Sequence, residues 1–423
     1  MSMYQLLIIA DDFTGALDTG VQLSMNGAHT YVIVGNVSSL SGPLPDVEVL
    51  VIDAETRHLS PSDAYRTVYD IVTEAVRLGI PHIFKKTDSA LRGNIGSELS
   101  ALLDAGKDQF LPFIPAFPQI GRTTEHGIHL INQIKVTDSV FGTDPFEPVK
   151  HSDIVELIGE QSSVYAVSCP VPAKDTVLPD TPGILVFDSA SETDLSETAD
   201  FLCAHALTHI MAGCAGFAQY LHGMLHLTIS PAGVPPQLSS KLLVICGSVN
   251  PITVTQLNNA EAEGFVRIRL TPQQKLCSGY WDTDIGRKDL QDLRSQLSGH
   301  PHLIIDSNDL QSNAPTSQYA AAHGIDMTGI RLGISHSIGH IVRSLFDSPD
   351  LGTLLITGGD TLLECMRCMN VNALEPICIF EPGIVLSRFR WKDSERYVLT
   401  KSGGFGSENL LSHIVDLLSQ NRK

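Results

Sequence analysis

Short apolar runs alternate with longer segments of helical periodicity along most of the chain. In the first half, the runs that predict strands are Leu6–Ala10, Val47–Ile52, His82–Lys85, Gln109–Ile114, Ser163–Val167 and Gly183–Phe187. Helical periodicity predicts helices at Gly15–Met25, Pro61–Leu78 and Gly96–Leu103. Ser60 is suited to cap the second of these, because Pro61 then takes its first position. Apolar strands separated by amphipathic helices are typical of a mainly parallel sheet covered on both faces.

Residues 230–236 interrupt this alternation. They include three prolines and one glycine, which neither a helix nor a central strand accommodates, so we expect a linker or an exposed crossover there. The alternation then restarts, with predicted strands at Lys241–Cys246, Val266–Leu270, His302–Asp306 and Thr353–Thr357 and predicted helices at Ile252–Gly264 and Gly333–Phe346. A chain of 423 residues is also long enough for two domains. We therefore expect an α/β fold of two domains, 1–232 and 233–423, each a mostly parallel sheet covered by helices.

Composition narrows the class of protein. Charged residues make up 18% of the chain and apolar residues 43%, which is typical of a globular protein. A net charge of −19 without a long Lys/Arg run disfavours binding to nucleic acid or to an anionic membrane surface. No apolar stretch approaches the ~18 residues of a membrane span. The N-terminal residues lack a basic leader, and the eight cysteines are scattered, as in a reduced compartment. We expect a soluble cytoplasmic protein.

Ligands of open α/β sheets bind at the carboxyl ends of the strands, so the loops that follow the predicted strands are the first candidates for a site. Asp11 and Asp12 follow the first strand, and one of two adjacent carboxylates can face a pocket while the other caps the next helix. Such a carboxylate could bind a substrate hydroxyl or act as general base, or both could be simple helix caps. Arg57 follows the next predicted strand and suits a substrate carboxylate, although a surface arginine is the alternative.

The loop after His82–Lys85 has the highest density of polar groups. Lys85, Lys86, Thr87, Asp88 and Ser89 stand together there, followed by an Arg-Gly-Asn sequence and a predicted helix. Cations, hydroxyls and backbone N–H groups at a helix N-terminus favour an anion. The loop therefore predicts a binding site rather than a solvated turn.

Glycines mark three strand ends in the second half. They follow the strands that end near Cys246, Thr357 and Lys401, and the second loop reads Gly358-Gly359-Asp360-Thr361. Glycine lets the backbone approach a ligand closely, Asp360 and Thr361 could cap the following helix, and free N–H groups could bind phosphate. These loops indicate a nucleotide, although the sequence contains neither a GxxxxGK[ST] loop nor a GxGxxG fingerprint at the head of a βαβ unit.

Other candidate sites receive little support. Cys365 and Cys368 have no second CxxC, and His336 and His340 have helical spacing without an evident carboxylate partner, so no metal ligands are predicted. No GxSxG elbow is present, which disfavours a hydrolase of that class.

Six segments resemble, in order, the four-carbon acid sugar kinase family. They are residues 9–23 (IADDFTGALDTGVQL), Glu55–Arg57, residues 85–99 (KKTDSALRGNIGSEL), Gly121–Thr124, residues 356–361 (ITGGDT) and residues 400–407 (TKSGGFGS). The resemblance extends over essentially the whole chain, and within the family it is closest to the D-threonate kinases. Two segments depart from the family pattern: Ala90 stands where a threonine is usual, and residues 125–127 and 131–133 lack the usual Gly pair and V-N-G.

The resemblance implies an N-terminal sugar-acid domain, a C-terminal ATP domain and phosphorylation of the terminal hydroxyl of a four-carbon sugar acid. Asp12, Arg57, Lys86, Thr87, Asp88 and Ser89 would contact the acid, and Ser248, Gly358, Gly359, Asp360, Thr361 and Gly404 would contact ATP. Arg57 and Lys86 suit the carboxylate of the acid, and either Asp12 or Asp88 would orient or deprotonate the hydroxyl, with Mg²⁺ on the ATP phosphates. D-erythronate and 3-oxo-tetronates remain alternative substrates, and a non-catalytic sugar-acid-binding protein is the alternative function. The oligomeric state is open, with a homodimer as one option.

Overall fold

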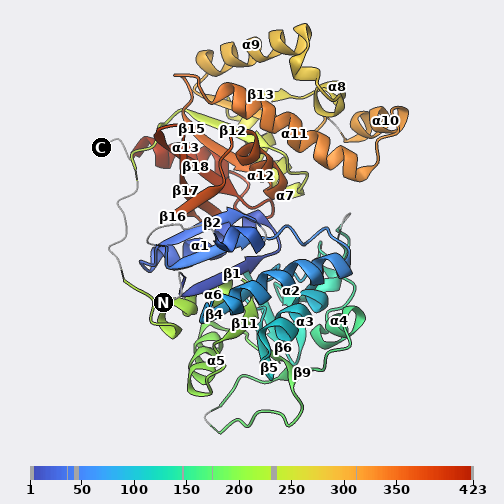
Figure 1. The fold of residues 1–423 in the computed structure, drawn as a ribbon. Coiled ribbons are helices and arrows are strands. Elements are labelled where there is room, and N and C mark those ends of the chain that lie inside the picture. Colours follow the sequence, from blue (N-terminus) through green and yellow to red (C-terminus); the bar gives the residue numbers. More distant parts are fainter. Residues whose placement is uncertain are drawn as a thin grey trace. The chain divides into compact units, whose positions relative to one another are not determined.

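A computed structural model describes residues 4–35, 37–41, 47–144, 147–173, 175–229, 236–310 and 312–420. The chain forms two compact units, Met1–Ala232 and Gly233–Lys423, coloured from blue to green and from yellow to red in Figure 1. Of the linker expected at residues 230–236, only Pro236 lies within these ranges; the remainder is outside the described residues. Within the same ranges no helix is long and apolar enough to cross a membrane.

The first unit is built on a parallel sheet. Its strands, in spatial order, are β2 (Thr30–Val34), β3 (Val49–Asp53), β1 (Leu6–Ala10), β4 (His82–Lys86), β11 (Ile210–Gly213), β5 (Phe110–Ile114), β10 (Gly183–Phe187) and β9 (Ala166–Cys169). The central strands β1 and β3 are buried along their whole length, which explains their continuous apolar sequences.

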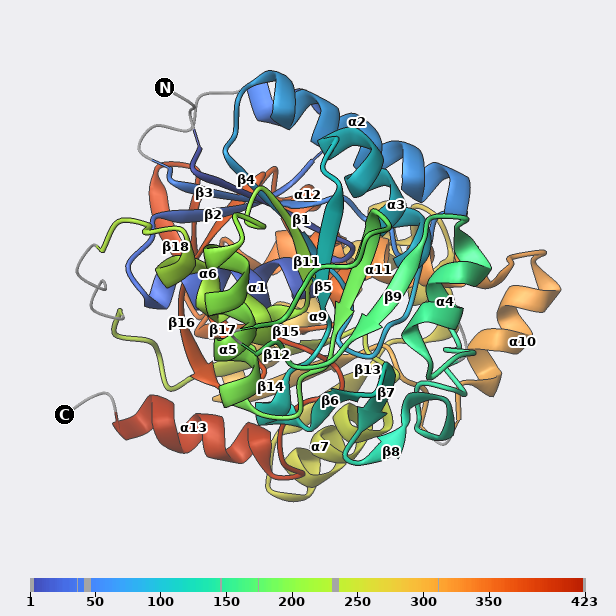
Figure 2. The same cartoon turned by 90° about the horizontal axis from the view of Figure 1, so that it is seen from below.

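Helices cover both faces of this sheet (Figure 2). One group is α1 (Phe13–Met25), α5 (Glu192–Ala204) and α6 (Ala215–Met224), and the other is α2 (Pro61–Arg77), α3 (Ile95–Gly106) and α4 (Ile154–Gln161). Short 3₁₀ helices are η1 (Val37–Ser41), η2 (Pro118–Ile120) and η3 (Val136–Asp138). A small antiparallel sheet of β6 (Arg122–Glu125), β7 (Ile128–Ile131) and β8 (Ile134–Lys135) follows β5 in the chain.

The second unit has a mixed sheet. Its strands, in order, are β13 (Val266–Arg269), β14 (His302–Asp306), β12 (Leu242–Cys246), β15 (Thr353–Thr357), β18 (Ser394–Lys401), β17 (Ile384–Trp391) and β16 (Ala373–Glu381). The first five run parallel, whereas β17 is antiparallel to both of its neighbours. The helices are α7 (Pro251–Ala262), α8 (Pro272–Leu276), α9 (Asp284–Gly299), α10 (Ala314–Ala322), α11 (Met327–Leu345), α12 (Gly359–Cys368) and α13 (Leu410–Gln420), with η4 at Tyr280–Asp282.

The expected α/β architecture is confirmed, with differences in detail. Helix α1 begins at Phe13 rather than Gly15, because Asp12 caps it, and α11 begins at Met327 rather than Gly333. The strand expected at Ser163–Val167 is wrong by three residues at its start. The strands β2, β6–β8, β11, β16 and β17 were not predicted, and of β18 only the end near Lys401 was. Strands β16–β18 form an antiparallel meander that the βα alternation does not reveal.

The strand registers align the carboxyl ends of neighbouring strands in both units. In the first unit, Ala10 pairs with Asp53 and Lys86, and Lys86 pairs with Gly213. We call this line of four residues the first strand-end row. In the second unit, Cys246 pairs with Asp306 and Thr357, and Thr357 pairs with Lys401. This line is the second strand-end row. Loops that are far apart in sequence therefore meet at one edge of each sheet.

Candidate active-site residues

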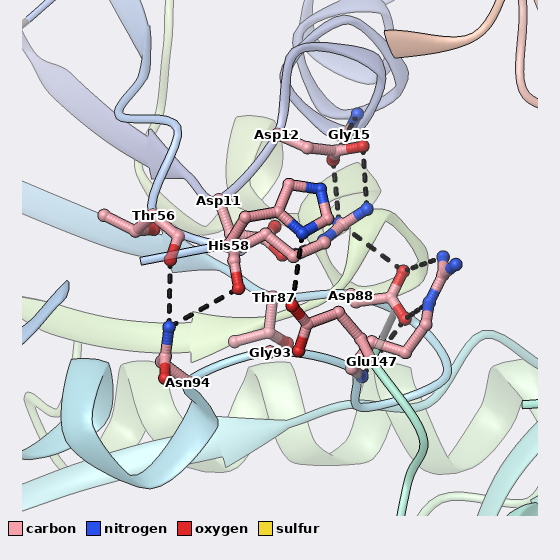
Figure 3. Close-up of polar contacts among 12 residues, drawn as sticks. Asp11, Asp12, Gly15, Thr56, His58, Thr87, Asp88, Gly93, Asn94 and Glu147 are labelled. Atoms are coloured by element: carbon pink, nitrogen blue, oxygen red, sulfur yellow. Dashed lines mark hydrogen bonds and ion pairs between the residues drawn. The ribbon is translucent and has the colours of Figure 1, made fainter. Parts of the chain in front are cut away.

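Two aspartates and one arginine form the centre of the first site (Figure 3). Asp12 is the N-cap of α1 and accepts a hydrogen bond from the N–H of Gly15 at 3.0 Å. Arg57 donates from Nε to Asp11 at 2.8 Å and from both Nη atoms to Asp12 at 2.9 Å. A Cβ on Gly15 would lie 2.6 Å from Asp12 Oδ1 and 2.7 Å from Lys86 Nζ, so a side chain there would displace one or both of these groups. Asp12 is thus a helix cap and a member of the cluster at once, and Arg57 is no surface arginine.

Asp88 belongs to the same cluster. Its carboxylate forms a two-pronged ion pair with Arg92, at 2.8 and 2.9 Å, and lies 3.6 Å from Arg57 Nη2. It also accepts backbone N–H groups of Ala90 and Arg92 at 3.2 Å. Burial opposes ionisation of Asp88, but the charges of Arg92 and Arg57 outweigh it and hold its pKa well below the usual value. Asp88 is therefore ionised, firmly held and a weak proton acceptor.

The three carboxylates around Arg57 differ in exposure. The side chain of Asp11 is 3% exposed and that of Asp88 is 9% exposed, whereas that of Asp12 is 25% exposed. For Asp11, too, burial is outweighed by the charges of Arg57, Lys86 and Lys85, so its pKa is lowered. Among the three, Asp12 is the carboxylate that a ligand reaches most easily.

The two adjacent lysines point to different places. Lys85 pairs with Glu98 of α3 at 2.8 Å, and both side chains are fully buried. Burial raises the pKa of Glu98, and the charge of Lys85 offsets part of that effect. Lys86 instead donates to the carbonyl of Thr87 at 2.7 Å, close to Gly15 and Asp12. Of the two lysines expected in the loop, only Lys86 therefore lies beside Asp12 and Gly15.

The remaining predicted residues of this loop follow Lys86. The backbone N–H of Thr87 donates to the carbonyl of Gly213, in the first strand-end row. The hydroxyl of Thr87 is buried with no hydrogen-bond partner among the described residues. The carbonyl of Ser89 lies 2.9 Å from Nε2 of His129, on β7. Asn94 does not cap α3 with its side chain but donates to the carbonyl of Thr56 (Figure 3). It also donates to the carbonyl of Leu59, and these bonds join this loop to the Arg57 loop.

The sequence did not single out two buried groups at this site. Asp53, at the end of β3, has one carboxylate oxygen without a partner among the described residues, and burial together with the charge of Asp12 raises its pKa well above the usual value. Burial lowers the pKa of His129 to about 4, so that its ring is neutral. A strand-ending aspartate and a histidine in a hairpin are common in sequences, and only burial shows that these two are unusual.

The second strand-end row carries the glycine loops. Gly358 is the N-cap of α12. Its φ of +106° is a backbone conformation that residues with a side chain rarely adopt. A Cβ on Gly358 would lie 3.6 Å from the backbone N of Ser248, and one on Gly403 would lie 2.8 Å from the hydroxyl oxygen of Ser248. Ser248 therefore lies close to both Gly358 and Gly403, and Gly404 follows Gly403 in the same loop. The structure brings the predicted nucleotide residues together.

Asp360 and Thr361 do not cap α12, contrary to expectation. Both lie in its first turn: the carboxylate of Asp360 pairs with Arg331 at 3.0 Å, and the Thr361 hydroxyl packs against Gly247. With glycine as N-cap and no side-chain cap, the first N–H groups of α12 are available to an anion.

Lys401 supplies the positive charge of this site. It is buried at the end of β18 and donates to Thr253 Oγ1 and to the carbonyls of Ser402 and Gly403, at 3.0–3.2 Å. Among the described residues no carboxylate forms an ion pair with it, and burial lowers its pKa to about 8. The hydroxyl of Thr357, in the same row, is buried without a partner among those residues. Lys401 stands in the TKSGGFGS segment, where nothing in the sequence pattern separates it from the surrounding glycines.

The expectation that His336 has no carboxylate partner was wrong. Its Nδ1 lies 3.0 Å from Glu364 Oε1, and Cys368 Sγ lies 3.8 Å from the same oxygen, because α11 and α12 pack side by side. Cys365 is buried elsewhere in α12 and takes no part. Burial and the charge of Glu364 raise the pKa of Cys368 to about 11, so its thiol is protonated. The three groups lie along α11 and α12, outside both strand-end rows.

Two family models match most of the chain. One is described as a sugar-binding N-terminal domain and matches residues 6–221, and the other as a nucleotide-binding C-terminal domain and matches residues 243–411. The chain is similar to a D-threonate kinase of Salmonella typhimurium, at 27% identity with 96% of both chains covered. It is also similar to a D-erythronate kinase of Heliobacterium modesticaldum, at 30% identity with 98% and 97% covered. A 3-oxo-tetronate kinase of Methylobacterium radiotolerans is 24% identical, with 97% and 98% covered.

Solved structures support the fold. A crystal structure from Salmonella typhimurium superimposes with a TM-score of 0.75 over 98% of both chains, at 19% identity. A Haemophilus influenzae protein superimposes with a TM-score of 0.68, at 18% identity, over 97% of this chain and all of the other. At such identities the likeness concerns the fold alone.

Proposed function

This chain belongs to the four-carbon acid sugar kinase family, and from that premise we propose that it transfers the γ-phosphoryl group of ATP to the terminal hydroxyl of D-threonate. The products are 4-phospho-D-threonate and ADP. One observation carries the proposal: the two strand-end rows offer complementary chemistry, a cluster of charged side chains in one unit and three glycine loops around a buried cation in the other.

In the first unit, Asp12 is the residue that we assign to the acceptor hydroxyl. The hydroxyl oxygen forms a bond to the γ-phosphorus, the bond to the β–γ bridging oxygen breaks, and Asp12 orients the hydroxyl and accepts its proton. Asp12 is more exposed than Asp11 and Asp88. Arg57 fixes Asp12 with two hydrogen bonds, and Asp88 is committed to Arg92. Lys86, Thr87 and Ser89 complete the substrate contacts from the adjacent loop.

In the second unit, we assign the phosphates of ATP to Ser248, Gly358, Gly359, Thr361 and Gly404. The support is the uncapped start of α12, the close approach that the glycines permit and the cation of Lys401 below them. Magnesium accompanies ATP in such reactions and neutralises phosphate charge. Both Asp306 and Asp360 pair with an arginine, but Asp306 is fully buried whereas Asp360 is 41% exposed in the first turn of α12, so Asp360 is the carboxylate that fits a magnesium ligand.

The D-erythronate kinase is a relative at 30% identity, which makes D-erythronate the second candidate. An ADP-release assay over D-threonate, D-erythronate, L-threonate and the 3-oxo-tetronates tests both, with ATP and Mg²⁺ in excess. We expect turnover with at least one acid, fastest with D-threonate. If an acid binds but none supports ADP release, the protein is a sugar-acid-binding protein without kinase activity.

A further inference from the structure

One guanidinium beside the charged cluster forms no ion pair with a carboxylate in the part of the chain that the structure describes. Arg57 is paired with Asp11 and Asp12, Lys85 with Glu98, and Arg92 with Asp88 and Asp144. Arg122, the first residue of β6, forms no ion pair with any described residue. Its protein contacts are weak or apolar: Nη1 lies 3.4 Å from the carbonyl of Ile120, and Nε is buried without a hydrogen-bond partner in the described ranges.

The chain places Arg122 beside the charged cluster. Strand β5 ends at Ile114, in the same sheet edge as Gly213 and Lys86, and the turn through η2 then leads to β6. The guanidinium carbons of Arg92 and Arg122 lie 5.2 and 5.3 Å from the centre of one ring, that of Phe141. Asp88, already committed to Arg92, is the principal negative charge near Arg122.

Burial is unfavourable for a cation that lacks a partner. The pKa of Arg122 is lowered because burial removes water from the guanidinium, and the charge of Arg92 adds to that effect. An anionic ligand would offset both the loss of water around the guanidinium and the repulsion from Arg92. A planar guanidinium with free N–H groups matches a carboxylate in shape, since two parallel hydrogen bonds can form.

We propose that Arg122 binds the carboxylate of the sugar acid and is therefore the residue that makes the site specific for an acid rather than a neutral polyol. The proposal rests on the proposed function for the nature of the substrate. It differs from the expectation that Arg57 and Lys86 hold this carboxylate. The charge of Arg57 is already balanced by two aspartates, which leaves Arg57 the task of holding Asp12, and Lys86 donates to the carbonyl of Thr87.

Calorimetry without ATP tests the proposal independently of catalysis. D-threonate, D-erythronate, L-threonate and the neutral polyol threitol are titrated into the unsubstituted protein, Arg122→Gln and Arg122→Lys. We expect Arg122→Gln to weaken binding of the acid by about 10- to 100-fold, as for loss of a charged hydrogen bond, and binding of threitol by less than about twofold. Arg122→Lys should recover part of the acid affinity, because it retains the charge without the planar fork.

Two further variants distinguish recognition of the carboxylate from a packing role of Arg122. Phe141→Leu removes the ring under Arg122, so an equal loss of acid and threitol binding in Phe141→Leu and Arg122→Gln would show a packing role and overturn the proposal. Arg66→Gln removes an exposed arginine from α2 and should change neither ligand. Unchanged acid affinity in Arg122→Gln also overturns the proposal. If no acid binds the unsubstituted protein, both this assignment and the substrate class fail, whereas acid binding that depends on Arg122 without ADP release overturns only the kinase.

Discussion

The two strand-end rows both lie at the carboxyl ends of parallel strands. Side chains surround the first row, whereas the surroundings of the second are mainly backbone. The first row is surrounded by side chains, with Arg57, Asp11 and Asp12 joined by hydrogen bonds of 2.8–2.9 Å. The second is formed mainly by backbone, with Gly358 and Gly404 leaving space and Lys401 buried below. A small polyol acid must be recognised by directed side-chain groups. A triphosphate can instead be bound by backbone N–H groups, which glycine leaves accessible because it has no Cβ.

The largest effect is expected from the side-chain site. Asp12→Asn retains the shape of the side chain but cannot accept a proton, and we expect kcat to fall by ~10²–10⁴-fold while the affinity for the sugar acid changes little. Steady-state ADP release and calorimetry measure the two quantities. Asp88→Asn is the matched variant, and a larger loss of kcat there than in Asp12→Asn would transfer the catalytic role to Asp88.

Breaking the buried ion pair between Lys85 and Glu98 should lower the stability of the protein rather than its turnover. Glu98→Gln leaves the ammonium of Lys85 buried without its partner. We therefore expect the free energy of unfolding, measured by denaturant titration, to fall by about 3–5 kcal/mol. The double variant Lys85→Met/Glu98→Leu should recover most of that loss. Glu74→Gln, which breaks an exposed pair with Arg77, should have little effect. If Glu98→Gln is as mild as Glu74→Gln, the pair does not stabilise the first unit.

The backbone site should respond to a side chain that merely occupies space. The one atom within 4 Å of a Cβ on Gly404, among the described residues, is Asn250 Nδ2 at 3.6 Å, so a Cβ at this position causes no clash. We nevertheless expect Gly404→Val to weaken ATP binding by about 10- to 100-fold, because the side chain fills the position that phosphate would take. Calorimetry with ATP and a thermal melt separate lost binding from lost folding. Normal ATP affinity in a stable Gly404→Val protein would place the nucleotide elsewhere.

The smallest expected effect is a pH dependence of ATP binding. Burial lowers the pKa of Lys401 to about 8 from 10.5, so the free protein loses this cation above about pH 8. ATP affinity should then fall by up to about tenfold per pH unit. Folding stability has the opposite trend: the unfolded chain holds this proton up to about pH 10.5, so the contribution of Lys401 to stability rises between pH 8 and 10.5. Lys401→Met should weaken ATP binding at about pH 7 and remove most of its dependence above about pH 8; an unchanged profile contradicts the assignment.

The apolar pattern of the sequence was sufficient for the architecture, and its polar loops indicated segments that the structure brings together at the two strand-end rows. The strand boundaries at Leu6–Ala10, His302–Asp306 and Thr353–Thr357 were predicted without error, because these segments are buried on both faces and read as continuous apolar runs. The density of polar groups at residues 86–89 and the glycines at 358–359 were also visible in the sequence, since both are unusual for a strand end.

Only the tertiary structure decided how the charges are distributed among partners. Arg57, Arg92 and Arg122 are alike in sequence, yet the first two are neutralised by aspartates and, among the residues that the structure describes, the third is not. Lys85 and Lys86 are adjacent, but successive strand residues point to opposite faces, so Lys85 pairs with Glu98 whereas Lys86 lies beside Gly15 and Asp12. The antiparallel meander β16–β18 and the pairing of His336 with Glu364 were equally hidden. Propensity and periodicity act over a few residues, whereas burial and ion pairing depend on segments that only folding brings together.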